Sequence, residues 1–343
     1  PKKCVDANGS VTYTEAFCPS NAPLVDTAPS SALSEIQMRA AVTSAVARAF
    51  AERDFQWLEK TSNDYRTSKA RTPSGLWKLT LFHVAIGDAI SRSANRNPNN
   101  YGNVDSFASE WLAKYPNSPT AHIVQSQALF SRAEAYRGNG MANTVAPEAW
   151  KPFYEFVALA KANLERSKSI ASVSPTWYEL MLKIGTAEGL ESAKFQKIFE
   201  EAVMREPSFY QTYFAALDYL LPKWGGSTAD VEQFALSAAK KTSTIEGKGM
   251  YARIYWYASQ SQFSTVLFTN SLAQWPMMRE GFDDVIAKYP DAWNMNNFAK
   301  FACMAKDQVK TKQLFDQIGT DLIPQAWGNK GLLGYCQGFA ARS

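Results

Sequence analysis

The side chains that could carry out catalysis are few and dispersed along this sequence. Histidine occurs only twice, at His83 in an apolar stretch that predicts a buried helix and at His122 near a predicted helix start, and we interpret both as structural. Glu188 and Glu191 are spaced to share one face of a helix, as a glycosidase acid–base pair would. Such pairs are usually solvated, and no metalloprotease, serine hydrolase or phosphate-loop motif is present. The sequence therefore predicts no enzyme and no catalytic, cofactor-binding or metal-binding residue.

Two glycine-rich turns could bind an anion through their backbone N–H groups. They are Gly-Asn-Gly at 138–140 and Gly-Gly at 225–226, and neither precedes a Lys-Ser or Lys-Thr pair. We interpret both as turns, because glycine lets the backbone reverse between helices and Ser227 opens a capping-box pattern. We expect the neighbouring Trp224 to pack across the helical hairpin rather than to stack on a ligand.

Four cysteines indicate the compartment. Cys4 and Cys18 flank a short hairpin, and Cys303 and Cys336 lie in the last helical hairpin. Two near-neighbour pairs with none left over predict two disulfides and an oxidising compartment. The alternative is four free thiols in a cytosolic protein, and a zinc site is disfavoured because the pairs lack CxxC spacing.

Composition excludes two classes of partner. The chain has 343 residues, of which 46% are hydrophobic, enough for a sizeable core. Its 36 basic and 32 acidic residues leave a net charge of +4, without the clustered Lys and Arg of a nucleic-acid-binding surface. No apolar run reaches the length of about 18 residues that a membrane span needs, and an exported mature chain would already have lost a signal peptide.

The N-terminal part of the chain differs from the rest. Residues 1–20 predict a β-hairpin, because an Asn-Gly pair between β-branched runs favours a two-residue type I′ turn. That turn would place Cys4 opposite Tyr13. Residues 21–33 form a linker rich in Pro, Ser and Ala without periodicity. Helical patterns then begin, so we expect one helical domain over residues 34–343.

Prolines and capping residues mark where the helices begin. Ser34 with Gln37, and Ser118 with Pro119, have the patterns of helix N-termini. Thr72-Pro73 is predicted to start a further helix in the same way. That helix is apolar nearly all round, so we expect it to be buried.

The stretch 175–241 organises the helical part, because it contains two successive helical hairpins. Pro175 and Pro207 each open a hairpin, and their spacing is close to the period of a tetratricopeptide repeat, about 34 residues. The endings Ala-Lys-Tyr-Pro at Pro116 and Pro290 repeat one another. We therefore predict an all-α fold, a tetratricopeptide-like helical-repeat solenoid (an α-α superhelix). A short disulfide-linked β-hairpin would precede it, and the C-terminal disulfide would pin its cap.

The repeat that ends at Pro207 is degenerate. About half of the tetratricopeptide pattern is met, at Leu182, Phe199, Ala202 and Pro207. The positions that depart from the pattern are Glu179, Lys183, Thr186 and Phe195.

Two parts of the chain resemble bacterial families. The segment KCVDANGSVTYTEAFCP within residues 1–20 resembles a small cysteine β-hairpin module that follows the signal peptides of envelope proteins. Residues 47–320 resemble a domain-of-unknown-function family of tetratricopeptide-like envelope and secreted proteins. The stretches that carry this resemblance are SKARTPSGLW (68–77), YRGNGMANTV (136–145), LPKWGGS (221–227) and NFAKFAC (297–303). The first resemblance implies a periplasmic or extracellular protein of a Gram-negative bacterium, and the second implies the fold but no activity.

A helical-repeat protein without catalytic residues is expected to bind partners on its concave face, which the first helix of each pair lines. We therefore predict a non-enzymatic protein–protein interaction scaffold. The side chains expected to meet the partner are Gln211, Asp218, Arg253, Trp256, Asn294 and Lys300. One alternative is a self-assembling subunit of an oligomer or filament, whose N-terminal hairpin contacts a neighbour. The other is a helical carbohydrate-active enzyme or glycan binder.

Overall fold

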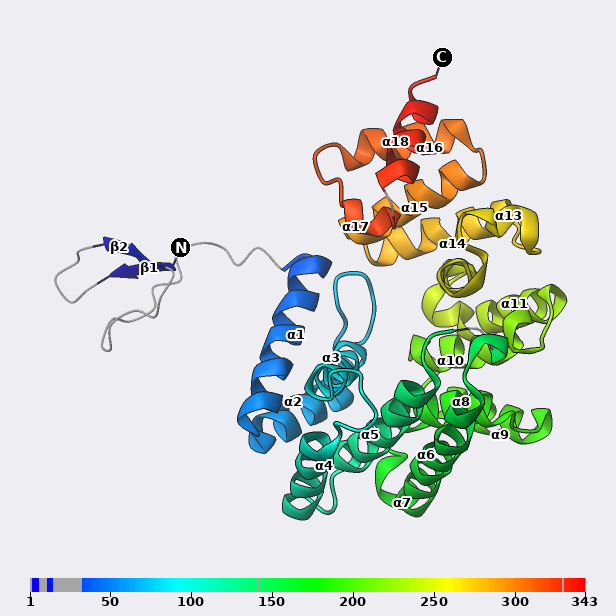
Figure 1. The fold of residues 1–343 in the computed structure, drawn as a ribbon. Helices are drawn as coiled ribbons and strands as arrows, with labels where there is room; N and C mark the ends of the chain where they lie inside the picture. Colours follow the sequence, from blue (N-terminus) through cyan, green and yellow to red (C-terminus); the bar gives the residue numbers. More distant parts are fainter. Residues whose placement is uncertain (1, 6–10, 15–32, 141, 329, 343) are drawn as a thin grey trace. The chain divides into compact units, whose positions relative to one another are not determined.

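The structure is a computed structural model that describes residues 2–5, 11–14, 33–140, 142–328 and 330–342 (Figure 1). The chain divides into two compact units, Pro1–Leu33 and Ser34–Ser343. The predicted Asn-Gly turn, Cys18 with its predicted disulfide to Cys4, and the linker up to residue 32 lie outside the described residues.

The described part of the N-terminal unit consists of two short strands. β1 (Lys2–Val5) and β2 (Val11–Thr14) pair antiparallel. Cys4 stands opposite Thr12, whereas we expected it to stand opposite Tyr13. The register of these two strands therefore differs by one residue from the expected one.

The regular elements among the described residues of the second unit are helices, as predicted, beside an isolated β-bridge between Arg71 and Trp77. Its longer helices are α1 (Glu35–Glu52), α2 (Phe55–Ser68), α3 (Lys78–Ser93), α4 (Gly102–Lys114), α5 (Pro119–Arg137), α6 (Pro147–Arg166), α8 (Pro175–Glu188), α9 (Ser192–Arg205), α10 (Tyr210–Leu220), α11 (Thr228–Glu246), α12 (Gly249–Ala258), α14 (Trp275–Lys288), α15 (Ala292–Met304), α16 (Gln308–Ile318) and α18 (Lys330–Ala340). The shorter segments are α7 (Lys168–Ala171), α13 (Leu267–Asn270), α17 (Pro324–Trp327), η1 (Ala142–Thr144), η2 (Pro222–Trp224), η3 (Ser259–Phe263) and η4 (Ser264–Val266).

Helix starts are confirmed where a neighbouring side chain satisfies the free backbone N–H groups. The hydroxyl of Ser34 accepts from the N–H of Gln37, whose side chain accepts from the N–H of Ser34, which completes a capping box. Ser118 caps α5 and Ser227 caps α11. Such a cap stabilises a helix by about 1 kcal/mol, and it needs only residues that are neighbours in the sequence.

The prediction that Thr72-Pro73 starts a helix is wrong. α3 begins at Lys78, and the four residues from Thr72 form a β-turn that is closed by the N–H of Gly75 on the Thr72 carbonyl (2.9 Å). Pro at the second position and Gly at the fourth are typical of a type I turn. Gly75 has a φ of +95°, which no α-helix contains. We name residues 69–77, which connect α2 to α3, the strap; they lie in the light-blue loop between these helices in Figure 1.

The helices pack in adjacent pairs and against the next pair along the chain. α1 packs on α3, α5 on α6, α8 on α10 and α12 on α14. α1 also contacts α15, which is far away in the sequence. The second unit is therefore held together both by local pairing and by contacts between its two ends.

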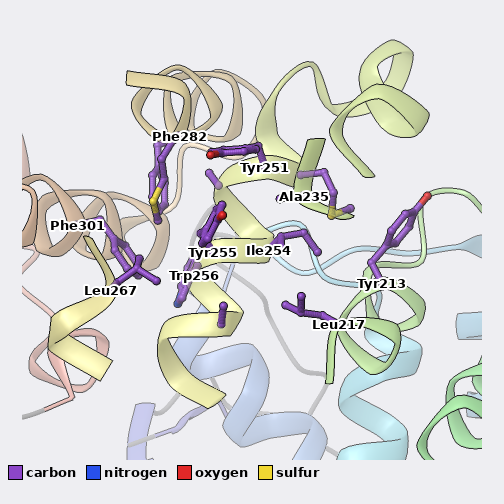
Figure 2. Close-up of a cluster of buried hydrophobic side chains, with 14 of the residues drawn as sticks. Tyr213, Leu217, Ala235, Tyr251, Ile254, Tyr255, Trp256, Leu267, Phe282 and Phe301 are labelled. Atoms are coloured by element: carbon purple, nitrogen blue, oxygen red, sulfur yellow. The ribbon is translucent and has the colours of Figure 1, made fainter. Parts of the chain in front are cut away.

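The largest buried cluster extends from α8 to α18. Figure 2 shows its centre, where Tyr251 and Tyr255 of α12 lie toward Phe282 of α14 and Ile254 lies on the side of Leu217. The Phe282 ring is fully buried and packs on Trp256, with ring centroids 5.9 Å apart. Burying a large apolar side chain stabilises the fold by about 1.5–3 kcal/mol, so this aromatic centre contributes strongly to the packing of α12 against α14.

The predicted disulfide between Cys303 and Cys336 is confirmed. It joins α15 to α18, with the two Cα atoms 5.7 Å apart, and both residues are fully buried. Stable disulfides are typical of proteins in oxidising compartments. None of the described helices is long and apolar enough to cross a membrane.

Candidate functional site

The six side chains predicted to bind a partner fall into a half-buried group and a buried group. Gln211 and Asp218 are half-buried. Four are buried, each with 8% or less of its surface exposed: Arg253, Trp256, Asn294 and Lys300. These four are therefore not available to a partner in this structure, and two different sets of contacts bury them.

The strap covers Arg253 and Asn294. The carbonyl of Ser74 accepts from Arg253 Nη2 at 2.8 Å and from Asn294 Nδ2 at 3.2 Å. The N–H of Ser74 donates to Glu35 Oε2 at 2.9 Å. The Arg253 guanidinium also lies over the Tyr210 ring, 4.6 Å from its centroid. One residue of the strap thus links α1, α12 and α15.

Arg71 anchors the strap to other helices. Its guanidinium donates to the Gly75 and Ser208 carbonyls and lies 4.9 Å from the centroid of the Tyr210 ring. The carboxylate of Glu246 is 3.8 Å from Arg71 Nη2. The surface around Arg253 that we expected to receive a partner is therefore occupied by the chain itself.

Lys300 and Trp256 belong to the interior. Lys300 Nζ donates to Asn297 Oδ1 and to the Ala326 carbonyl, both at 2.8 Å, and burial lowers the pKa of Lys300 to about 8. The Trp256 ring packs on Phe301, with centroids 6.4 Å apart. These contacts hold α15 against α17 and against α12.

An open groove lies on helices nearer the start of the unit. It has a volume of about 780 Å³ and is lined mainly by α3, α5 and α8, together with Asp218 of α10 and Trp224 of η2. We name it the α3–α5–α8 groove. Its volume is within the range of ligand-binding sites, about 300–1,000 Å³. Of the six side chains predicted to bind a partner, Asp218 is the one that lines it.

The polar lining of the groove recurs at helical spacing. On α8 it consists of Thr176, Glu179, Lys183 and Thr186, which are three or four residues apart and so share one face. The last three of these are positions where the repeat departs from the tetratricopeptide pattern. Polar side chains at these three pattern positions are therefore the sequence signal for the groove. From the sequence we interpreted them only as a sign of a degenerate repeat and did not predict the groove.

His83 lines the groove from α3, with 5% of its surface exposed. Gln127 Nε2 donates to the His83 carbonyl (2.9 Å), and Gln127 Oε1 lies 3.4 Å from His83 Nδ1. Because an amide oxygen can only accept, Nδ1 carries the proton. Burial lowers the pKa of His83 to about 4, so the ring is neutral at pH 7. Its Nε2 is then an acceptor, and it has no partner among the described residues.

We expect the His83 imidazole to remain neutral down to about pH 4, whereas the same group in the unfolded chain binds a proton near pH 6.5. The stability that depends on a neutral His83 is therefore complete above pH 6.5 and is lost as the pH falls towards 4, by about 3 kcal/mol at most. Two-bond ¹H–¹⁵N NMR spectra report both the tautomer and the titration. His122 is the only other histidine, so a His122→Gln variant assigns the signals. Titration of His83 near pH 6.5 would contradict this expectation.

Four carboxylates and three cationic side chains line the groove. Glu179 Oε1 pairs with Lys183 Nζ at 2.6 Å. Desolvation acts to lower the pKa of Lys183, but the charge and hydrogen bond of Glu179, together with the charges of Glu134 and Asp218, raise that pKa. Desolvation by the groove walls raises the pKa of Glu134 and of Asp218. Asp88 of α3 is exposed and lines the same groove.

Trp224 does not pack across the hairpin as we expected. It is 44% exposed and lines the groove, and the guanidinium of Arg137 lies 5.7 Å from its ring centroid. The following Gly225 has a φ of +96°, so the Gly-Gly pair is a turn, as predicted. Because this turn ends η2 directly after Trp224, the indole remains at the groove instead of entering the core.

The groove offers acceptors, charges and an aromatic surface, and it is suited to binding. Among the described residues, no three His, Cys, Asp or Glu side chains are grouped so that they could hold a metal ion. No family model, no curated protein and no solved structure matches the chain. The chemistry of the groove itself is therefore the basis for a functional proposal.

Proposed function

We propose that the chain is a non-enzymatic binding scaffold and that its α3–α5–α8 groove receives a segment of a partner protein. One observation carries this proposal. The groove is about 780 Å³ in volume and contains two buried polar atoms without a partner among the described residues, His83 Nε2 and Thr176 Oγ1. Native proteins satisfy nearly all buried polar groups, and a bound segment would satisfy these two.

The state of the reactive side chains favours binding over catalysis. Lys183 is charged and paired with Glu179, so it is a poor nucleophile. The ring of His83 is fixed by Gln127. The lining side chains extend from three successive first helices, as they do on the binding faces of helical-repeat proteins.

We extend the proposal to the architecture and the compartment. α1, α3, α5, α8, α10 and α12 each pack on the next in this order, which supports a tetratricopeptide-like solenoid and the resemblance to that envelope family. The Cys303–Cys336 disulfide supports the periplasm or the exterior of a Gram-negative cell. In this proposal the N-terminal hairpin is an appended module.

We expect Val84→Trp to block the binding of the partner. Val84 lines the groove and is 53% exposed, so an indole at this position fills the groove without displacing the core. Val309→Trp is the matched control, because Val309 of α16 is 64% exposed and does not line the groove. The wild type and both variants are immobilised and exposed to an envelope extract, and the retained proteins are quantified by mass spectrometry.

A protein that is retained by the wild type and by Val309→Trp, but at least about tenfold less by Val84→Trp, supports the proposal. Equal retention by all three forms contradicts it, as does the absence of any retained protein at low salt. Light scattering tests the self-assembling alternative. An oligomer that becomes monomeric when residues 1–33 are removed would favour that alternative over the groove.

A further inference from the structure

We infer that the segment bound in the α3–α5–α8 groove carries Lys or Arg side chains. This inference rests on the proposed function and specifies the chemistry of the partner. It follows from the acceptors and charges that the groove leaves unmatched.

Three carboxylates line the groove without a cation at ion-pair distance. Asp88, Glu134 and Asp218 line it, and none of them forms an ion pair with a described residue, whereas Glu179 is paired with Lys183 at 2.6 Å. Asp218 accepts a hydrogen bond from the Tyr257 hydroxyl at 2.8 Å, and the charges of Lys223 and Lys183 act on it without forming an ion pair. A ligand that brings positive charge would therefore meet three carboxylates.

A buried acceptor points in the same direction independently of the carboxylates. His83 is 5% exposed, and its Nε2 has no partner among the described residues. Since Nδ1 carries the proton towards Gln127 Oε1, Nε2 can only accept. The groove thus requires a hydrogen-bond donor at this wall as well.

The cations of the groove without an ion pair are fewer than its unpaired carboxylates. Lys183 is paired with Glu179. Arg137 donates to the Gly138 carbonyl and lies over the Trp224 ring, 5.7 Å from its centroid. An anionic ligand could pair with Arg137 and with Arg96, on the exposed loop after α3, since neither forms an ion pair with a described residue. That ligand would also face the three unpaired carboxylates, so an acidic segment is disfavoured.

Ammonium and guanidinium groups match the unmet acceptors. Lys offers three N–H donors and Arg offers five, and neither has an acceptor that needs a partner. Their methylene stems can lie along the apolar side chains of Val84 and Leu180, which also line the groove. The partly exposed indole of Trp224 adds an aromatic surface that attracts cations.

Titration calorimetry of the full chain with short peptides tests the inference. Tetra-lysine and tetra-arginine are the probes, spermidine is a cation without a peptide backbone, and tetra-glutamate and maltotetraose are the acidic and neutral comparisons. We expect the two basic peptides to bind, tetra-glutamate and maltotetraose not to bind, and the affinity of the basic peptides to fall as salt is added. Spermidine is expected to bind more weakly than tetra-lysine, because it lacks a peptide backbone that can satisfy Thr176 Oγ1.

Charge-neutral variants locate the binding. Glu134→Gln and Asp218→Asn are each expected to weaken tetra-arginine binding by about tenfold or more. Glu155→Gln is the matched control, because Glu155 is exposed on α6 and does not line the groove, and its effect should stay within about twofold. If Asp218→Asn fails to fold, Asp88→Asn replaces it, since Asp88 is exposed.

Tighter binding of tetra-glutamate or of maltotetraose would overturn the inference, and so would basic peptides that bind equally to the wild type and to Glu134→Gln. Failure of the inference is distinguishable from failure of the proposed function. A partner whose capture is lost in Val84→Trp but that has no basic segment would refute the inference and leave the groove as the binding site. A partner that Val84→Trp captures as well as the wild type does would refute both the inference and the proposed function.

Discussion

Gly75→Ala is expected to lower the free energy of unfolding by about 2–4 kcal/mol, through positive-φ strain and overpacking together. Gly75 has a φ of +95°, and a Cβ at this position would lie 2.8 Å from the Tyr289 ring and 2.9 Å from Arg253 Nη2. Neither neighbour can move freely. The Tyr289 hydroxyl donates a hydrogen bond to Glu246. Arg253 donates a hydrogen bond to the strap, and its guanidinium lies over the Tyr210 ring.

Urea unfolding followed by circular dichroism measures the change. Gly102→Ala is the control, because Gly102 begins α4 with no heavy atom within 4 Å of a new Cβ, and we expect a change of less than about 0.5 kcal/mol. Hydrogen exchange adds a second readout. A loosened strap should speed exchange in α12 and α15, which the strap links to α1. Equal stabilities of the two variants would show that the strap is not tightly packed.

Removing the Cys303–Cys336 disulfide by the double replacement Cys303→Ala, Cys336→Ala is expected to destabilise the C-terminal region by about 4 kcal/mol in the chain-entropy model. The two cysteines are 33 residues apart in sequence, so the bond removes much conformational freedom from the unfolded chain. Because both are fully buried, replacing them by alanine also leaves a small space in the core.

Thermal unfolding is measured for the wild type and the double variant, each with and without reductant. The comparison distinguishes the effect of losing the disulfide from the effect of replacing the two side chains. The reduced wild type should unfold at nearly the same temperature as the double variant, and reductant should change the variant little. Hydrogen exchange should rise first in α18, which the bond joins to α15. Unchanged unfolding of the double variant would mean that packing around Trp327 and Phe315, whose rings stack 5.3 Å apart, holds this region without the bond.

The strap occupies the surface on which the sequence predicted a partner. We expected a partner to bind around Arg253 and Asn294, and the strap fills that surface. The α3–α5–α8 groove is open, and its lining includes Asp218 from the expected set. The proposed binding site and the surface covered by the strap thus lie on different parts of the chain.

The features that the sequence alone determined are those held by interactions between residues close together in the chain. Ser34, Ser118 and Ser227 cap helices through bonds to residues at most three positions away, so their patterns predict helix starts directly. The pairing of Cys303 with Cys336 follows from their closeness in sequence, 33 residues, although α16 and α17 lie between the two helices that they join and the expected single hairpin is wrong. These interactions do not depend on how distant parts of the chain are arranged.

Only the tertiary structure decided the conformation of the strap and the position of the groove. Thr72-Pro73 has the pattern of a helix start, but the turn is held by bonds from Ser74 to Glu35, Arg253 and Asn294, which are 39, 179 and 220 residues away. Those bonds satisfy backbone groups that a helix would otherwise satisfy. The groove likewise combines α3, α5 and α8, and its polar residues appear in the sequence only as departures from a repeat pattern. Periodicity reveals which side of a helix is apolar, whereas contacts between distant segments decide whether its polar side faces water, a strap or a ligand.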